Sequence, residues 1–141
     1  MAAIAASRPP APLHPAHAFF LSGSLTLFAG ALLSNIAYWR SYEIQWNNFA
    51  SWLIAGGLVL GAVALACAVA GALGRRRGGG RLAYPLVLAV AWVVQLFNAL
   101  MHARDAWAGM PGGLILSVVG GLLALAAVWL GFGAARRGVL S

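Results

Sequence analysis

The sequence predicts an all-α integral membrane protein, an up-down bundle of four transmembrane helices. Two observations lead to this fold class. First, 62% of the 141 residues are hydrophobic and only 8% are charged, and a soluble globule of this composition would leave large apolar patches in water. Second, long apolar runs take up nearly the whole chain, and each exceeds the roughly 20 residues that a helix needs to cross the hydrocarbon core of a bilayer. The connections are short, so successive helices are expected to be antiparallel neighbours.

The limits of each span follow from the apolar runs and from the residues that flank them. The predicted spans cover residues 17–38, 49–72, 82–103 and 111–135. Residues 1–16 form an N-terminal segment, and residues 136–141 form a C-terminal tail. The predicted connections are residues 39–48, 74–81 and 104–110. Prolines lie near three of the predicted helix starts, where a missing backbone N–H costs little, at Pro15, Pro85 and Pro111.

Arginine distribution predicts the orientation of the bundle. The chain has no lysine, and seven of its nine basic residues fall on one side, whereas only Arg40 and Arg104 fall on the other. Because cytoplasmic loops carry the excess of basic residues, both termini are predicted to be cytoplasmic. Tryptophans gather at the opposite boundary, as an aromatic belt requires, at Trp39, Trp46, Trp52 and Trp107. The run Arg75–Arg81 fits this topology, and binding of anionic lipid is the alternative function for it.

The composition also limits the classes of function. Basic residues sit at the edges of apolar runs and not on an aromatic, solvent-facing surface, so nucleic-acid binding is not expected. The single cysteine, Cys67, lies within a span, so no disulfide framework or cysteine metal cluster is expected. No third ligand accompanies His14 and His17, which argues against a metal site. No catalytic constellation is recognisable, and the chain is expected not to be an enzyme.

Small residues at helical spacing predict where the helices pack. Lipid supplies no hydrophobic drive between helices, so close approach depends on glycine, alanine and serine. The second run carries Gly57 and Gly61, and the fourth carries a nearly continuous small stripe that includes Gly121 and Gly131. We expect these glycines to pack against neighbouring helices of the same chain. A homodimer interface is the competing interpretation.

Polar residues within the spans predict a candidate site near the outer surface. On the third helix Gln95, Asn98, His102 and Asp105 fall within about an 80° arc at 100° per residue. The first helix runs parallel to the third and places Asn35 at a similar depth. Such groups must turn inward and pair, which predicts either a hydrogen-bonded polar core or a ligand pocket. The candidate residues are Asn35, Tyr38, Gln95, Asn98, His102 and Asp105. Within this set we expect His102 to pair with Asp105.

The positions of the histidines limit which cofactors the chain can bind. A six-coordinate haem needs two ligands at one depth, whereas His14 and His17 lie on the order of 30 Å from His102 along the helices. No pair within the chain is therefore expected to clamp a haem. Ligation by His102 alone, ligation completed by another subunit, and binding of a quinone stay open, so no cofactor is predicted outright.

Three stretches carry a resemblance to a known family. These are Leu13–Phe20 (LHPAHAFF), Met101–Trp107 (MHARDAW) and Pro111–Ser117 (PGGLILS). Over about residues 13–138 the chain resembles a bacterial family of four-span membrane proteins, the domain of unknown function numbered twenty-two thirty-one. The resemblance implies signature positions at His14, Pro15, His102, Arg104, Asp105, Trp107, Pro111, Gly113 and Ser117. It implies a bacterial inner-membrane location and a redox partner, but no reaction. The second helix departs from the pattern because it ends in arginine instead of an acidic residue.

Two function hypotheses follow. The first is a non-enzymatic membrane subunit that anchors, stabilises or assists a larger complex of the respiratory or redox kind. The second is an electron-transfer protein that binds quinone or haem near the outer surface. A transporter has less support, because no span carries an interior proline or a buried acid.

Overall fold

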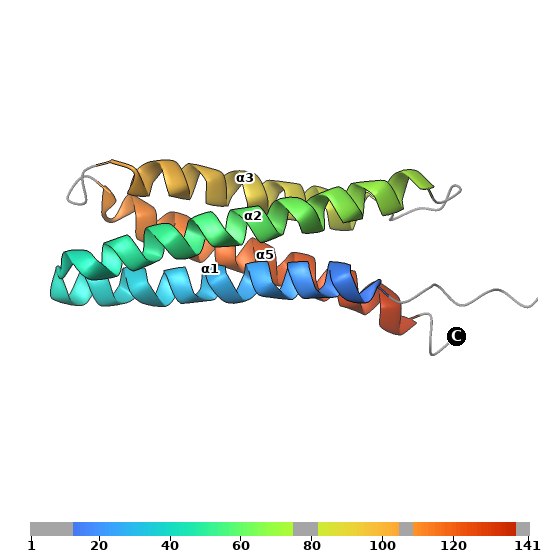
Figure 1. Ribbon diagram of the computed structural model, residues 1–141, viewed down its shortest axis with the longest axis horizontal. Coiled ribbons are helices and arrows are strands. Elements are labelled where there is room, and N and C mark those ends of the chain that lie inside the picture. Colours follow the sequence, from blue (N-terminus) through green and yellow to red (C-terminus); the bar gives the residue numbers. More distant parts are fainter. Residues whose placement is uncertain (1–12, 75–81, 105–108, 138–141) are drawn as a thin grey trace, which may run out of the picture.

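Four helices form the part of the chain that the computed structural model describes, which is residues 13–74, 82–104 and 109–137, with side chains through residue 133. They are α1 (Pro15–Ser41), α2 (Ile44–Gly74), α3 (Ala83–His102) and α5 (Gly112–Arg137). Each is long and apolar enough to cross a membrane. Figure 1 shows an elongated bundle in which consecutive helices run antiparallel, and α1 also contacts α5. The predicted all-α four-helix architecture is confirmed.

Where α1 connects to α2, both helices are longer than the apolar runs of the sequence predicted. The predicted connection of residues 39–48 is wrong, because α1 continues to Ser41 and α2 already begins at Ile44. Tyr42 closes α1 in the left-handed conformation, with φ of 56°, and its N–H donates to the carbonyl of Tyr38 at 2.7 Å. Both helices extend past the hydrocarbon, since polar and aromatic residues are tolerated at headgroup depth and do not interrupt a helix. The other boundaries lie within two residues or so of their predicted positions.

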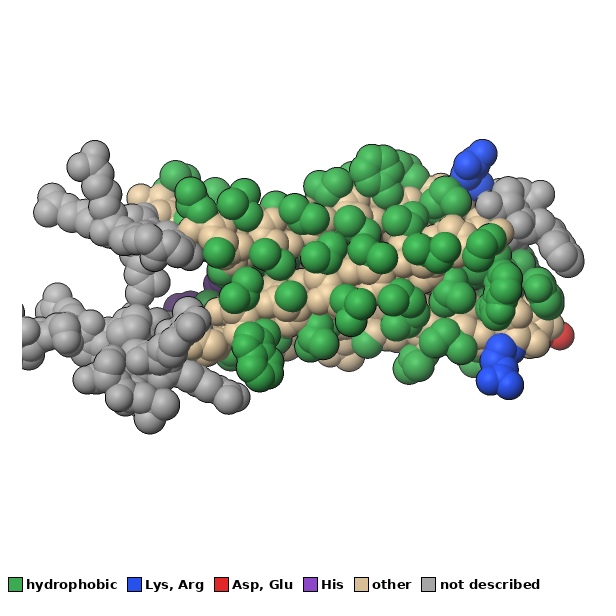
Figure 2. Space-filling view, turned by 180° about the vertical axis from the view of Figure 1, so that it is seen from behind, with side chains coloured by type: hydrophobic (Ala, Val, Ile, Leu, Met, Phe, Trp, Pro, Cys, Tyr) green, Lys and Arg blue, Asp and Glu red, His purple; other side chains and the backbone are tan. Residues whose placement is uncertain are grey.

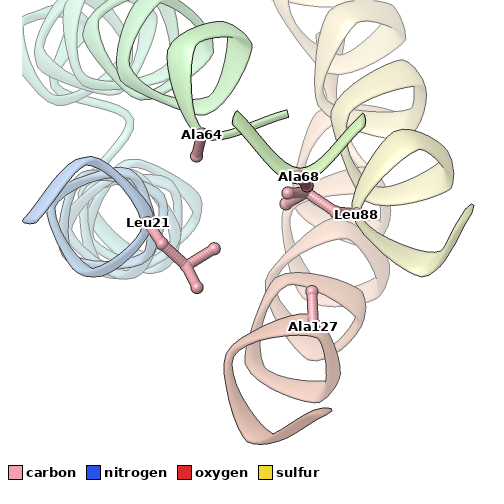
Figure 3. Packing of buried hydrophobic residues seen from close by; sticks show 5 residues of the cluster. All are labelled: Leu21, Ala64, Ala68, Leu88 and Ala127. Atoms are coloured by element: carbon pink, nitrogen blue, oxygen red, sulfur yellow. The ribbon is translucent and has the colours of Figure 1, made fainter. Parts of the chain in front are cut away.

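The centre of the bundle is filled by small and aliphatic side chains from all four helices. Figure 3 shows Leu21, Ala64, Ala68, Leu88 and Ala127 directed toward a common axis, and all are almost fully buried. A second cluster, Phe28 with Ala91 and Ala124, lies further toward the end where α1 meets α2. Three of the central residues are alanines, which lets the helix backbones approach closely.

The outside of the bundle is apolar along its length. Figure 2 shows hydrophobic side chains over the flanks, and the arginine and acidic side chains of the described residues that are visible in it lie at one end. Trp52, Trp129 and Leu73 are each more than 70% exposed. Such a surface is expected of a protein whose solvent is lipid, because bilayer tails are as apolar as leucine.

Several glycines occupy the close contacts that the small-residue pattern predicted. A Cβ at Gly57 would lie 2.5 Å from Phe28, and one at Gly61 would lie 3.0 Å from the Ser24 hydroxyl. A Cβ at Gly131 would lie 3.1 Å from Tyr84. Close approach also allows Ser24 to donate to the Gly57 carbonyl at 2.9 Å. These three glycines are therefore packing positions.

Gly121 was predicted as a packing position, and this prediction is wrong. A Cβ built there meets nothing within 4 Å among the described residues. Its neighbour Gly120 makes the contact instead, since a Cβ there would lie 2.7 Å from the Gln95 side chain. Gly120 and Gly121 point in directions that differ by 100° around α5. Because small residues form a nearly continuous stripe in this sequence, the sequence does not show which of the two glycines faces a neighbouring helix.

Candidate functional site

A network of five buried polar side chains joins three helices near the turn between α1 and α2. We call it the polar network, and it consists of Asn35 from α1, Gln95, Asn98 and His102 from α3, and Ser117 from α5. His102 is 9% exposed and the other four are 0% exposed. Turning these groups inward removes them from the lipid, where an unpaired polar group is costly.

Ser117 lies at the centre of the polar network. Its hydroxyl oxygen accepts from the Asn35 side-chain amide at 2.7 Å and from the Asn98 side-chain amide at 2.8 Å. The Asn98 amide also donates to Gln95 Oε1 at 2.9 Å. One small hydroxyl thus ties α1, α3 and α5 together at one depth.

His102 uses both of its ring nitrogens inside the bundle. Nε2 lies 2.8 Å from Asn35 Oδ1, and Nδ1 lies 2.9 Å from the backbone carbonyl of Asn98, one turn earlier. The expected pairing of His102 with Asp105 stays a prediction. Asp105 itself lies outside the described residues.

Glycines of α5 make room for the network. A Cβ at Gly113 would lie 2.9 Å from His102 Cε1, and one at Gly120 would lie 2.8 Å from Gln95 Nε2. Two buried atoms of the network have no hydrogen-bond partner, Gln95 Nε2 and Asn98 Oδ1. The network is therefore closely packed but not fully satisfied.

A groove opens beside the network. We call it the outer groove. It has a volume of about 500 Å³ and is lined by Ile44, Gln45, Asn47, Asn48, Phe49 and Ser51 of α2 and by His102 of α3. The groove does not lie between α1 and α3, where the ligand pocket was expected as one of two alternatives, and Asn35, Gln95 and Asn98 are hydrogen-bonded within the polar network there. Of the predicted pocket residues that the structure describes, only His102 lines the groove.

A second polar pair lies toward the opposite end of the bundle. His17 Nε2 lies 2.8 Å from the Tyr84 hydroxyl, which links α1 to α3. The aromatic rings are 5.9 Å apart. The polar network and this pair lie near opposite ends of α1. The apolar clusters that contain Leu21 and Phe28 lie between them.

The remaining predicted residues have varied surroundings. Tyr38 is buried and packs edge to face against Tyr42. His14 caps α1, where its Nδ1 accepts from the Ala16 N–H at 3.3 Å, and Pro15 is the first helical residue. Arg104 and Pro111 are exposed, and Trp107 lies outside the described residues.

Sequence reasoning missed two parts of this arrangement. Ser117 was predicted as a member of the small stripe of the fourth helix, with Gly113 and Gly121, and as a family signature position, but its hydrogen bonds to two other helices were not predicted. The groove residues Gln45, Asn47 and Asn48 were assigned to a connection. They would have been identified if the polar segment before Phe49 had been predicted as helix.

In the described ranges no three histidine, cysteine or acidic side chains gather as metal ligands.

Comparison with known proteins gives one family. The model of the family described as "Predicted membrane protein (DUF2231)" matches residues 13–140, which is nearly the whole chain. Neither the curated proteins nor the solved structures give a match to the chain. The matched range contains all four helices, the polar network and the outer groove. The chain therefore belongs to the DUF2231 family of predicted membrane proteins.

Proposed function

We propose that this protein is a non-enzymatic subunit of the bacterial inner membrane that anchors, stabilises or assists a larger complex of the respiratory or redox kind. Its interior polar groups support this role, because they bond mainly to one another and fasten the helices together. A bundle of this kind can serve as a fixed support for another membrane subunit.

The observation that carries the proposal is an uncovered face on α2. Ala62, Ala66 and Ala70 recur every four residues and are exposed. Together with Leu65, Val69, Leu73 and Trp92 they line a shallow groove of about 560 Å³. Small residues at this spacing allow another helix to approach closely within a membrane. A helix of a partner subunit fits this face, and a second copy of this chain is the competing occupant.

The test is copurification in mild detergent, followed by identification of stoichiometric partners. The visible absorption spectrum of the complex, before and after reduction, reports whether a redox partner is present. Ala66→Leu should fill the groove and release the partner, whereas Ala126→Leu, an exposed alanine of α5, should retain it. Retention of the partner by both variants would refute the role assigned to this face. Recovery of a homodimer alone would refute the proposed complex.

A second candidate function is electron transfer with quinone or haem near the outer surface. The outer groove favours a small ligand, because its volume lies within the range of about 300–1,000 Å³ common for ligand sites. Haem ligation is disfavoured, since Nε2 of His102 would have to leave Asn35. His102→Ala distinguishes the two functions. Loss of electron transfer in a normally assembled complex favours the second, and parallel loss of stability and assembly favours the first.

A further inference from the structure

The outer groove presents hydrogen-bonding groups that the bundle does not use. Asn47 is only 9% exposed, and its backbone carbonyl accepts from Ser51. Its side-chain amide has no hydrogen-bond partner among the described residues, and the same holds for the amides of Gln45 and Asn48. Because Asn47 lines the groove, its amide is open to a ligand there and can pair with an acceptor that enters.

The groups around the groove favour a ligand that accepts hydrogen bonds. The groove lies against the first two turns of α2, where the first backbone N–H groups lack an acceptor within the helix. The N-terminal end of the helix dipole also favours an electronegative atom. No arginine is among the lining residues, and Glu43 directly precedes α2. An acceptor without net charge therefore suits the groove better than an anion.

The position of the groove indicates an amphiphilic ligand. Trp46 and Trp52, which flank it along α2, are 42% and 73% exposed. Tryptophan prefers the boundary between hydrocarbon and headgroups, so the groove opens at that depth. Ile44 and Phe49 supply an apolar part of the lining, beside the amides. A molecule with a polar head and an apolar tail matches both parts.

We propose that the outer groove binds an amphiphile of no net charge through a carbonyl oxygen, which accepts from the side-chain amide of Asn47. His102 forms part of the wall and connects the ligand to the polar network. A quinone head and the ester carbonyl of a phospholipid share this chemistry. The proposal goes beyond the anchoring role and does not depend on it, because it concerns binding alone.

The experiment measures binding by the full chain in detergent micelles. The probes are decylubiquinone in one arm and a short-chain phosphatidylcholine in the other. Asn47→Leu should weaken binding of the preferred probe by roughly three- to tenfold, the value of one hydrogen bond. Thr26→Ala removes an exposed hydroxyl that donates within α1 to the Ser22 carbonyl, and it should leave binding unchanged.

A second readout locates the ligand without any substitution. Nitrogen-15 spectra of the histidines should show a shift for His102 at saturating probe and none for His17, which lies toward the other end. Binding of decylubiquinone alone identifies a quinone site, and binding of phosphatidylcholine alone identifies a lipid site. The proposal is overturned if neither probe binds, if Asn47→Leu binds like wild type, or if the His102 signal does not move. The proposed function is tested by copurification of a partner, which does not depend on probe binding. A failure of the probes to bind therefore leaves the proposed function unaffected.

Discussion

Replacing Gly120 by alanine should destabilise the bundle, whereas the same change at the adjacent Gly121 should not. A Cβ at Gly120 would lie 2.7 Å from Gln95 Cδ and 3.0 Å from Gln95 Cγ, closer than carbon atoms approach without a shift. Gln95 is fully buried, and its Oε1 accepts from Asn98. The side chain can move only by disturbing the polar network.

The expected change in the free energy of unfolding has two contributions, overpacking and helix propensity. Overpacking of a filled interior costs about 1–3 kcal/mol. Alanine gains up to about 1 kcal/mol over glycine in helix propensity, but this gain is common to both positions and cancels in their difference. At Gly121 a Cβ meets nothing within 4 Å in the described part of the chain. The two variants should therefore differ by about 1–3 kcal/mol in their free energy of unfolding.

The assay is reversible unfolding in mixed micelles, followed by circular dichroism. The clash can be isolated by repeating Gly120→Ala in a Gln95→Ala background, where the contact is removed and the cost of the new methyl group should disappear. Equal stabilities for the Gly120 and Gly121 variants would refute the reasoning. An unchanged cost in the Gln95→Ala background would show that Gln95 is not the obstacle.

Three further predictions concern the hydrogen bonds and the topology. His102→Ala should lower the unfolding free energy by about 1–2 kcal/mol, because it removes a buried ring that donates to one of two carbonyl oxygens, and because it leaves a cavity; thermal melting in detergent measures the change, and an unaltered melting temperature would contradict it. Ser24→Ala should cost only about 0.6 kcal/mol in the same assay, since one hydrogen bond between membrane helices averages that value, and a loss comparable to that of His102→Ala would be inconsistent with this. In a Cys67→Ser background, an impermeant thiol reagent outside the cell should label a cysteine at Gln45 but not at Gly79, and the reverse pattern would invert the predicted orientation.

The residues that meet in the polar network were largely predictable, and the reason is geometric. Gln95, Asn98 and His102 recur at three- and four-residue spacing, so they share one face of any α-helix. Lipid excludes unpaired polar groups, which fixes that face toward the interior. Antiparallel order then places Asn35 at the same depth. Their partners were not predictable, because the rotation of each helix about its own axis depends on all of its neighbours.

The sequence by itself determined that the chain spans a membrane four times, because hydropathy and length are local properties that do not depend on how the helices pack. It also indicated that Asn35, Gln95, Asn98 and His102 face inward. The tertiary structure alone decided that Gly120 and not Gly121 packs against Gln95, that Ser117 joins three helices, and that the groove lies against α2. In a helix that is apolar all round, hydrophobicity does not distinguish one face from another. The orientation of each helix is therefore set by side-chain fit and hydrogen bonding across the bundle, and these arise only when all four helices are in place.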